Sequence, residues 1–149
     1  MIHQPLVSVV VPSYCHADYL LDCLLSVHDQ TYKSIELVLV DDASTDASFA
    51  RAEALLSTAF AQRFANTMLI RNETNLGAHA TINRGIAASK GSHVAVINSD
   101  DLFYPERIAA QIEALAETGS ELSFTLVDIV AVPADVPLIP EDFRLFTLR

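Results

Sequence analysis

Short apolar runs rich in β-branched residues alternate along the chain with segments whose apolar residues recur at helical spacing. A continuous run of this kind is typical of a strand that is buried on both faces of a sheet. Four strand–helix repeats in succession predict an α/β fold, in which a mostly parallel sheet is covered by helices on both faces. The runs predict buried strands at residues 7–12, 35–42 and 92–97, a short strand at 67–71 and a fifth strand at 121–132.

The segments between these runs carry the residues that typically begin and end helices. Short polar side chains favour N-caps, proline favours the first turn, and glycine favours the residue that follows the last turn. These signals predict four helices: from Asp18, from the caps Ser44-Thr45-Asp46 to about Phe64, from the turn Asn75-Leu76-Gly77 to a glycine C-cap near Lys90-Gly91, and from Pro105 to about Thr118-Gly119.

No internal repeat or linker divides the sequence, which predicts a single domain over residues 1–149. The alternation fails after Val132, where Pro133, Pro137 and Pro140 interrupt any regular element. We therefore expect an irregular tail from about residue 133.

Composition narrows the class of protein. Apolar residues make up 51% of the 149 residues and charged residues 19%, which excludes a disordered chain. The net charge is −10, and a surface this acidic repels nucleic acid and anionic lipid. An acidic protein can still bind a nucleotide when a divalent cation supplies positive charge.

The two cysteines, Cys15 and Cys23, have no spacing typical of a disulfide scaffold or a zinc site, so we expect reduced and mostly buried thiols. No apolar run approaches the ~20 residues that a membrane span requires. The N-terminus has no basic segment or cleavage site of a signal peptide. These features predict a cytoplasmic domain.

Candidate chemistry follows the predicted strands. In an open parallel sheet, ligands bind at the carboxyl ends of the strands. There the sequence has Pro12-Ser13-Tyr14, the pair Asp41-Asp42, the turn Asn75-Leu76-Gly77, and Asn98-Ser99-Asp100-Asp101. Two acidic pairs that meet at one edge are costly unless a cation lies between them or they are well solvated. Oxygen ligands of this kind suit Mg²⁺ or Mn²⁺.

A purely structural interpretation remains open for each feature. Asp42 can serve as an Asx turn before a helix, and Tyr14 as a half-buried aromatic residue. The five histidines show no spacing typical of metal ligands, although His79, which follows the Gly77 turn, could face the cleft.

Two long stretches carry a family resemblance. VSVVVPSYCHADYLLDCLLSVHDQTYKSIELVLVDDASTDAS resembles the opening of a family 2 glycosyltransferase. NLGAHATINRGIAASKGSHVAVINSDDLFYPERI resembles the next half of that module, with its metal motif and the proline that follows. The similarity runs from Val7 to about Thr118 and implies the Rossmann-like GT-A fold of nucleotide-diphospho-sugar transferases.

The resemblance also implies roles for the strand-end residues. Pro12 and Tyr14 would contact the nucleobase, and the turn from Asn75 to Gly77 would close over the nucleotide. Asp42 would hydrogen-bond the base, while Asp41 supports the turn.

Asn98-Ser99-Asp100 would be the chain's version of the DXD motif, with Asp100 as the metal ligand and Ser99 near the ribose. Asn98 stands where an aspartate is more usual, and Asp101 would restore part of the lost charge as a second metal residue.

The implied function is inverting, metal-dependent transfer of a sugar from a nucleoside diphosphate, commonly uridine diphosphate, with Mn²⁺ or Mg²⁺ as cofactor. The acceptor would be a hydroxyl group of a glycan, a lipid-linked intermediate or another molecule in cell-surface polysaccharide synthesis. A nicotinamide-binding Rossmann domain fits poorly, since the first glycine is Gly77. A receiver-type domain would have its acidic pair after the first strand, whereas here the pair Asp41-Asp42 follows the second.

The C-terminus departs from the family pattern. The family places its catalytic base and acceptor-binding half well beyond the metal motif, so we expect a C-terminally truncated piece or one module of a larger protein. Glu141-Asp142 resembles the base motif but follows Asp100 closely, so Asp142 is either a base or a loop residue. The alternative function is therefore a non-catalytic nucleotide-sugar-binding module or a fragment of a larger glycosyltransferase.

Overall fold

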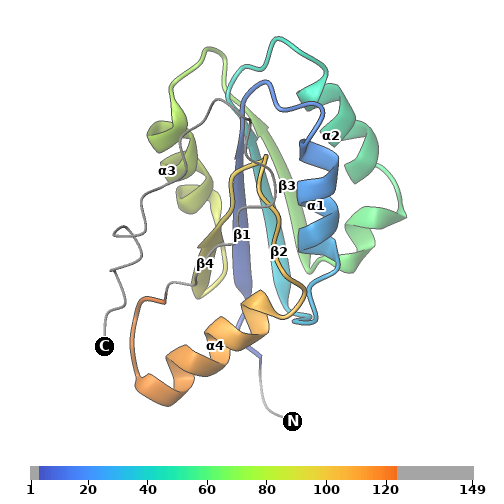
Figure 1. Cartoon of the computed structure of the whole chain (residues 1–149). Helices are drawn as coiled ribbons and strands as arrows, with labels where there is room; N and C mark the ends of the chain where they lie inside the picture. Colours follow the sequence, from blue (N-terminus) through green and yellow to red (C-terminus); the bar gives the residue numbers. More distant parts are fainter. Residues whose placement is uncertain (1–3, 124–149) are drawn as a thin grey trace, which may run out of the picture.

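A parallel four-stranded sheet forms the centre of the computed structural model, which describes residues 4–123 (Figure 1). The strands run in the order β3-β2-β1-β4, and every neighbouring pair is parallel. The predicted α/β class and parallel sheet are therefore confirmed. The strands are β1 (Val7–Ser13), β2 (Ile35–Asp41), β3 (Asn66–Arg71) and β4 (His93–Val96).

Helices cover both faces of this sheet, as predicted (Figure 1). Helices α1 (Leu20–His28), α2 (Ser48–Leu56) and α4 (Arg107–Thr118) share one core with alternate residues of β1 and β2. Helix α3 (Ala78–Ala88) packs on the opposite face. All seven residues of β1 and of β2 are buried, because these central strands have a helix layer on each side.

Helix α3 lies unusually close to the sheet at Gly85. A Cβ atom there would lie 2.4 Å from Val10 Cγ1 and 3.3 Å from Val40 Cγ2. Glycine is therefore the residue that allows the helix backbone to reach β1 and β2. The segment after α3 differs from prediction: its C-cap is Ser89, and Gly91 instead passes the backbone of Leu6 and Ser8, where a Cβ would meet atoms at 2.7 Å.

Two further predicted helix boundaries are wrong. The first helix begins at Leu20 rather than Asp18. The second ends at Leu56, and a separate 3₁₀ helix, η1 (Ala59–Arg63), covers most of the remainder. The hydroxyl groups of Ser57 and Thr58 donate to carbonyls three residues back, and Thr58 also accepts from Phe60 N, so local side-chain bonds end the α-helix.

The other helix-end predictions hold with small shifts. Asp46 accepts a bond of 2.9 Å from Ser48 N, so it alone of the three predicted caps satisfies a backbone donor of α2. Pro105 lies in the turn two residues before α4, and Gly119 ends α4 in the left-handed conformation.

Strand β4 is not buried as predicted. Val94 and Val96 are 42% and 37% exposed, because α3 packs on β1 and β2 and leaves this face of β4 open within the described residues. Residues 121–123, the start of the predicted fifth strand, are not in a strand, and its remainder lies outside residues 4–123. The tail from residue 133 and Glu141-Asp142 also lie outside this range.

A buried carboxylate fastens the end of the sheet opposite the carboxyl ends of the strands. Glu36 is fully buried and accepts bonds from Ser8 Oγ (2.5 Å), Asn66 Nδ2 (2.9 Å) and Lys90 N (2.8 Å). Burial opposes ionisation, but these three bonds outweigh it and hold the pKa of Glu36 below its ordinary value. The carboxylate thereby joins β1, β2, β3 and the segment that leads into β4.

Candidate functional site

The carboxyl ends of β1, β2 and β4 and the first turns of α3 surround a cleft of about 460 Å³. Residues from four separate loops meet there, as the strand-end rule predicts. Asp42 and Asp100, which are 58 positions apart in the sequence, line the same cleft. Its lining residues are Pro12, Ser13, Tyr14, His16, Asp42, Asn75, Gly77, Ala78, Thr81, Asn98, Ser99 and Asp100.

Asp42 accepts three hydrogen bonds, more than any other side chain that lines the cleft, and it is only 3% exposed. Its Oδ1 accepts bonds from Asn72 Nδ2 (2.6 Å) and Leu76 N (2.8 Å), and its Oδ2 accepts from Gly77 N (2.9 Å). Burial opposes ionisation, but the bonds to the carboxylate outweigh it and lower the pKa of Asp42. Asp42 is therefore an ionised anchor for the turn before α3.

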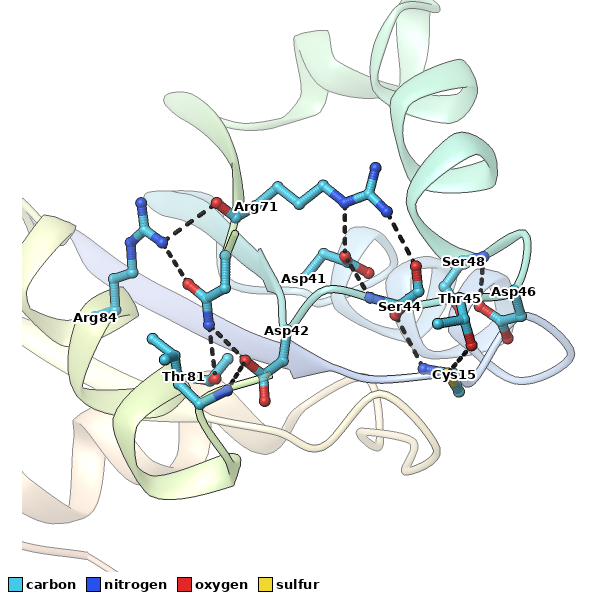
Figure 2. Close-up of polar contacts among 12 residues, drawn as sticks. Cys15, Asp41, Asp42, Ser44, Thr45, Asp46, Ser48, Arg71, Thr81 and Arg84 are labelled. Atoms are coloured by element: carbon cyan, nitrogen blue, oxygen red, sulfur yellow. Dashed lines mark hydrogen bonds and ion pairs between the residues drawn. The ribbon is translucent and has the colours of Figure 1, made fainter. Parts of the chain in front are cut away.

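A relay of polar side chains orients this anchor (Figure 2). The Arg84 guanidinium donates to Asn72 Oδ1, which leaves the Asn72 amide nitrogen to donate to Asp42 and to Thr81 Oγ1 (3.1 Å). Arg84 also donates to the Arg71 carbonyl (3.2 Å), so β3 and α3 are held together beside the cleft.

Asp41 lies behind the cleft rather than in its lining. Its Oδ2 accepts from Ser44 N (3.0 Å) and lies 3.4 Å from Arg71 Nε, while Arg71 Nη2 donates to the Ser44 carbonyl (Figure 2). The two neighbouring aspartates thus have different surroundings: Asp41 fixes the loop from β2 to α2, and Asp42 faces the cleft.

A second hollow of about 720 Å³ is formed by residues 43–46 of this loop and residues 71–73. It contains no residue from the ends of β1 or β4. None of the residues predicted for the site lines this second hollow, so the candidate site is the smaller cleft.

The end of β1 contributes both an aromatic and an unsatisfied polar group. Pro12 is buried, and Tyr14 is 46% exposed at the rim. Ser13 lines the cleft and is buried, yet its Oγ has no hydrogen-bond partner among residues 4–123. A buried hydroxyl without a partner is costly, so this position favours a bound ligand that can satisfy it.

The loop after β4 is fastened through Asn98. Its carbonyl accepts from Asp101 N (3.0 Å) and from Cys23 Sγ (3.4 Å), and its side chain donates to Asp101 Oδ2 (3.2 Å). Asp101 therefore faces Asn98 and is outside the cleft lining, whereas the Asp100 side chain is 48% exposed on the cleft wall.

The two cysteines are free thiols in different surroundings. Burial, together with the charges of Asp101 and Asp100, raises the pKa of Cys23 to about 12, so this thiol is not a nucleophile at neutral pH. Cys15 is only partly buried, contrary to the expectation of two mostly buried thiols. A bond with Thr45 Oγ1 lowers the pKa of Cys15 (Figure 2).

Several residues of this region were not predicted, among them His16, Asn72 and Thr81. His16 Nδ1 lies 2.8 Å from Ser99 Oγ and 3.8 Å from Asp100 Oδ1. A search for metal-ligand spacing overlooks this histidine, but it lies only two residues beyond Tyr14, so the strand-end rule could have found it. His79 is exposed and does not line the cleft.

The oxygen atoms that line the cleft suit a hard divalent cation that takes some of its ligands from the protein and the others from a substrate. Within residues 4–123, no group of three or more His, Cys, Asp or Glu side chains is arranged to hold a metal. Asp100 supplies one accessible carboxylate, and Mg²⁺ is commonly bound by one or two carboxylates together with substrate phosphates and water.

No helix in the described part of the chain is long and apolar enough to cross a membrane.

The sequence matches the family described as glycosyl transferase family 2 over residues 8–133. It is 32% identical over 117 residues to glycosyltransferase GlyG of Streptococcus pneumoniae serotype 4, covering 78% of this chain and 37% of GlyG. It is 32% identical over 128 residues to the putative teichuronic acid biosynthesis glycosyltransferase TuaG of Bacillus subtilis, covering 86% of this chain and 49% of TuaG. The chain thus spans about half or less of each relative.

Solved structures show the same fold. The crystal structure of S. aureus TarS 1–349 in complex with UDP matches with a TM-score of 0.69 and 28% identity, over 78% of this chain and 33% of that one. The mannosyltransferase PcManGT from Pyrobaculum calidifontis, in complex with GDP-Man and Mn²⁺, matches with a TM-score of 0.68 and 24% identity, over 77% of this chain and 33% of that one. The GT-A arrangement expected from the sequence is therefore present.

Proposed function

The chain belongs to glycosyltransferase family 2, and from that premise we propose that its cleft binds the nucleoside diphosphate of a sugar donor, with uridine as the base. The proposed reaction is inverting, metal-dependent transfer of the sugar to an acceptor hydroxyl in cell-surface glycan synthesis. The observation that carries the proposal is the gathering of Asp42, Asp100 and the unsatisfied Ser13 hydroxyl in one cleft at the strand ends. The UDP complex of TarS and the name of TuaG support the choice of base and pathway class.

The nucleobase is proposed to bind between Tyr14 and Asp42. An ionised carboxylate has about four acceptor positions, and Asp42 uses three of them within the chain. One position on Oδ2 remains for an N–H group of a base. Pro12 and the half-exposed ring of Tyr14 would pack against the base, and the turn from Asn75 to Gly77 would close over the nucleotide.

The diphosphate is proposed to lie toward the loop after β4. Asp100 would hold Mn²⁺ or Mg²⁺, and Ser99 would contact the ribose. Asp101, the second residue expected at the metal, would act from behind by fixing Asn98. A bound cation would neutralise the charge that develops as the sugar–phosphate bond breaks.

The acceptor hydroxyl would attack the anomeric carbon from the face opposite the diphosphate, and its proton would pass to a carboxylate base. The acceptor is proposed to be a glycan, a lipid-linked intermediate or another hydroxyl compound. Since the chain spans about half or less of GlyG and TuaG, a nucleotide-sugar-binding module without turnover is the alternative. A glycosyl-transfer assay on this chain and on a longer version would separate the two functions.

Thermal shift with UDP, GDP and CDP, each with and without Mn²⁺, tests the binding proposal directly. A ligand present at 100 times its Kd stabilises a fold by about 2.7 kcal/mol, which corresponds to about 5–10 °C for a domain of this size. We expect such a shift with UDP and Mn²⁺, and a smaller one with UDP alone. If no nucleoside diphosphate shifts the melting temperature, the proposed function is wrong.

A further inference from the structure

The cleft has an unusual charge balance for a site that would receive a diphosphate. Its twelve lining residues include the carboxylates of Asp42 and Asp100 but no lysine or arginine. The whole chain carries a net charge of −10, so its general field also opposes an anionic ligand. Among the lining residues, His16 has the one basic side chain, and its ring nitrogens can donate hydrogen bonds.

His16 is held in place by both its backbone and its ring. Its carbonyl accepts bonds from Tyr19 N (3.0 Å) and Leu20 N (2.9 Å) at the start of α1, and its ring meets the Tyr19 ring edge to face. Nδ1 lies 2.8 Å from Ser99 Oγ, and Ser99 is buried. The imidazole is therefore fixed between α1 and the loop after β4.

Only one edge of this imidazole is occupied. Nδ1 makes the contacts with Ser99 and Asp100, whereas Nε2 has no hydrogen-bond partner among residues 4–123. The side chain is 35% exposed and lines the cleft. When the Ser99 hydroxyl donates to Nδ1, the neutral ring carries its proton on Nε2, which is then a free N–H donor.

We infer that His16 binds a phosphate oxygen of the donor's diphosphate through Nε2–H, while Nδ1 and Ser99 fix the ring. The inference rests on the proposed function, because it assigns a residue to the diphosphate end of the same site. It gives the acidic cleft a donor from the protein itself, in addition to any charge that a cation supplies.

Two substitutions separate the ring nitrogens. In His16→Asn the shorter amide lies near the position of Nδ1, so it can keep the Ser99 contact while it loses the Nε2 donor. In His16→Gln the longer amide reaches toward the position of Nε2 and gives up the Ser99 contact. His79→Asn and His79→Gln are matched controls, since His79 is exposed at the start of α3 and does not line the cleft.

UDP affinity is measured by titration calorimetry in EDTA and in MnCl₂, and uridine affinity by ligand-observed NMR. We expect His16→Asn to weaken UDP binding about tenfold or more in both buffers, as the loss of a hydrogen bond to a charged group would do. Uridine affinity should stay within about twofold, and His16→Gln should keep most of the UDP affinity. Both His79 variants should bind UDP like the unchanged chain.

Several results would overturn the inference. Unchanged UDP affinity in His16→Asn would remove the contact, and an equal loss for UDP and uridine would indicate general damage to the cleft. A greater loss in His16→Gln would make His16 only a positioning residue for Ser99, and a loss confined to MnCl₂ would make it a metal ligand. If the unchanged chain binds neither UDP nor GDP in either buffer, the proposed function itself fails and the inference falls with it.

Discussion

Replacing Asp42 by asparagine tests whether this carboxylate anchors the turn before α3. Three donors converge on its two oxygens: Asn72 Nδ2, Leu76 N and Gly77 N. An amide has one oxygen, so its best orientation keeps the two bonds at the Oδ1 position and turns its NH₂ group toward Gly77 N. Asp42→Asn therefore loses the bond from Gly77 N, because the NH₂ group and the Gly77 N–H are both donors. It also removes the charge that strengthens the other two bonds.

The magnitude follows from these changes. A hydrogen bond to a charged group contributes about 1.5–3 kcal/mol, and weakening the remaining two bonds adds to the loss. Gly77 is exposed, so water can satisfy its N–H and limit the penalty for an unpaired donor. We expect Asp42→Asn to lower the free energy of unfolding at pH 7 by about 2–4 kcal/mol, a large share of the ~5–15 kcal/mol typical of a domain.

Urea denaturation followed by circular dichroism measures this loss. The control is Asp18→Asn, because the Asp18 side chain is 87% exposed and lies 3.5 Å from Arg51 in a surface pair that contributes little. The pKa of folded Asp42 is below its unfolded value, so the stabilisation is present above the unfolded pKa and is lost as the pH falls through the folded pKa. The difference between Asp42→Asn and the unchanged chain should shrink below about pH 4. A loss at pH 7 no greater than that of Asp18→Asn would refute the anchoring role.

Three further changes are predicted. Asp100→Ala should abolish the Mn²⁺-dependent part of UDP stabilisation in thermal shift and leave the fold intact, because its side chain is 48% exposed in a loop; retained Mn²⁺ dependence would exclude it as the ligand. Gly85→Ala should cost about 2 kcal/mol in urea denaturation, because the new Cβ would lie 2.4 Å from Val10 Cγ1 and this crowding exceeds the ~1 kcal/mol gain in helix propensity. Adding Val10→Ala should then cost less than the two single changes together, and simple additivity would contradict the contact. Glu36→Gln should cost about 1–3 kcal/mol at pH 7 and progressively less below about pH 4, since the lowered pKa of Glu36 makes its contribution present above the unfolded pKa and lost in acid; a difference that is constant from pH 3 to pH 7 would rule this out.

The sequence predicts strand positions well because each strand is a compact apolar run with little helical spacing. It predicts the burial of β4 poorly, because the identity of Val94 and Val96 does not reveal that α3 packs on β1 and β2 and leaves these two side chains exposed. The end of α2 was missed because Ser57 and Thr58 interrupt an otherwise helical composition through local hydroxyl bonds.

The site was predictable where it follows strand ends. Asp42 and Asp100 lie there, and the parallel sheet brings their loops to one cleft. Asn72 was missed because its role depends on which side chains meet it across loops. His16 lies three residues after the end of β1, within reach of the strand-end rule, but metal-ligand spacing does not reveal it. The family resemblance implied different roles for Asp41 and Asp42, and the structure gives them different surroundings: Asp41 meets Ser44 N and Arg71, whereas Asp42 lines the cleft.

The strand order has a consequence for how this chain acquires its structure. The partner of β1 on its outer side is β4, so Val7 pairs with His93, whereas β2 pairs on the other side from only 28 residues away. At synthesis rates of about 5–20 residues per second, roughly 3–11 s separate the end of β2 from the end of β4. During that interval one edge of an apolar strand lacks its native neighbour, and exposed edges of this kind promote association between chains. Chaperone protection of the nascent chain would therefore matter most before residue 96 emerges.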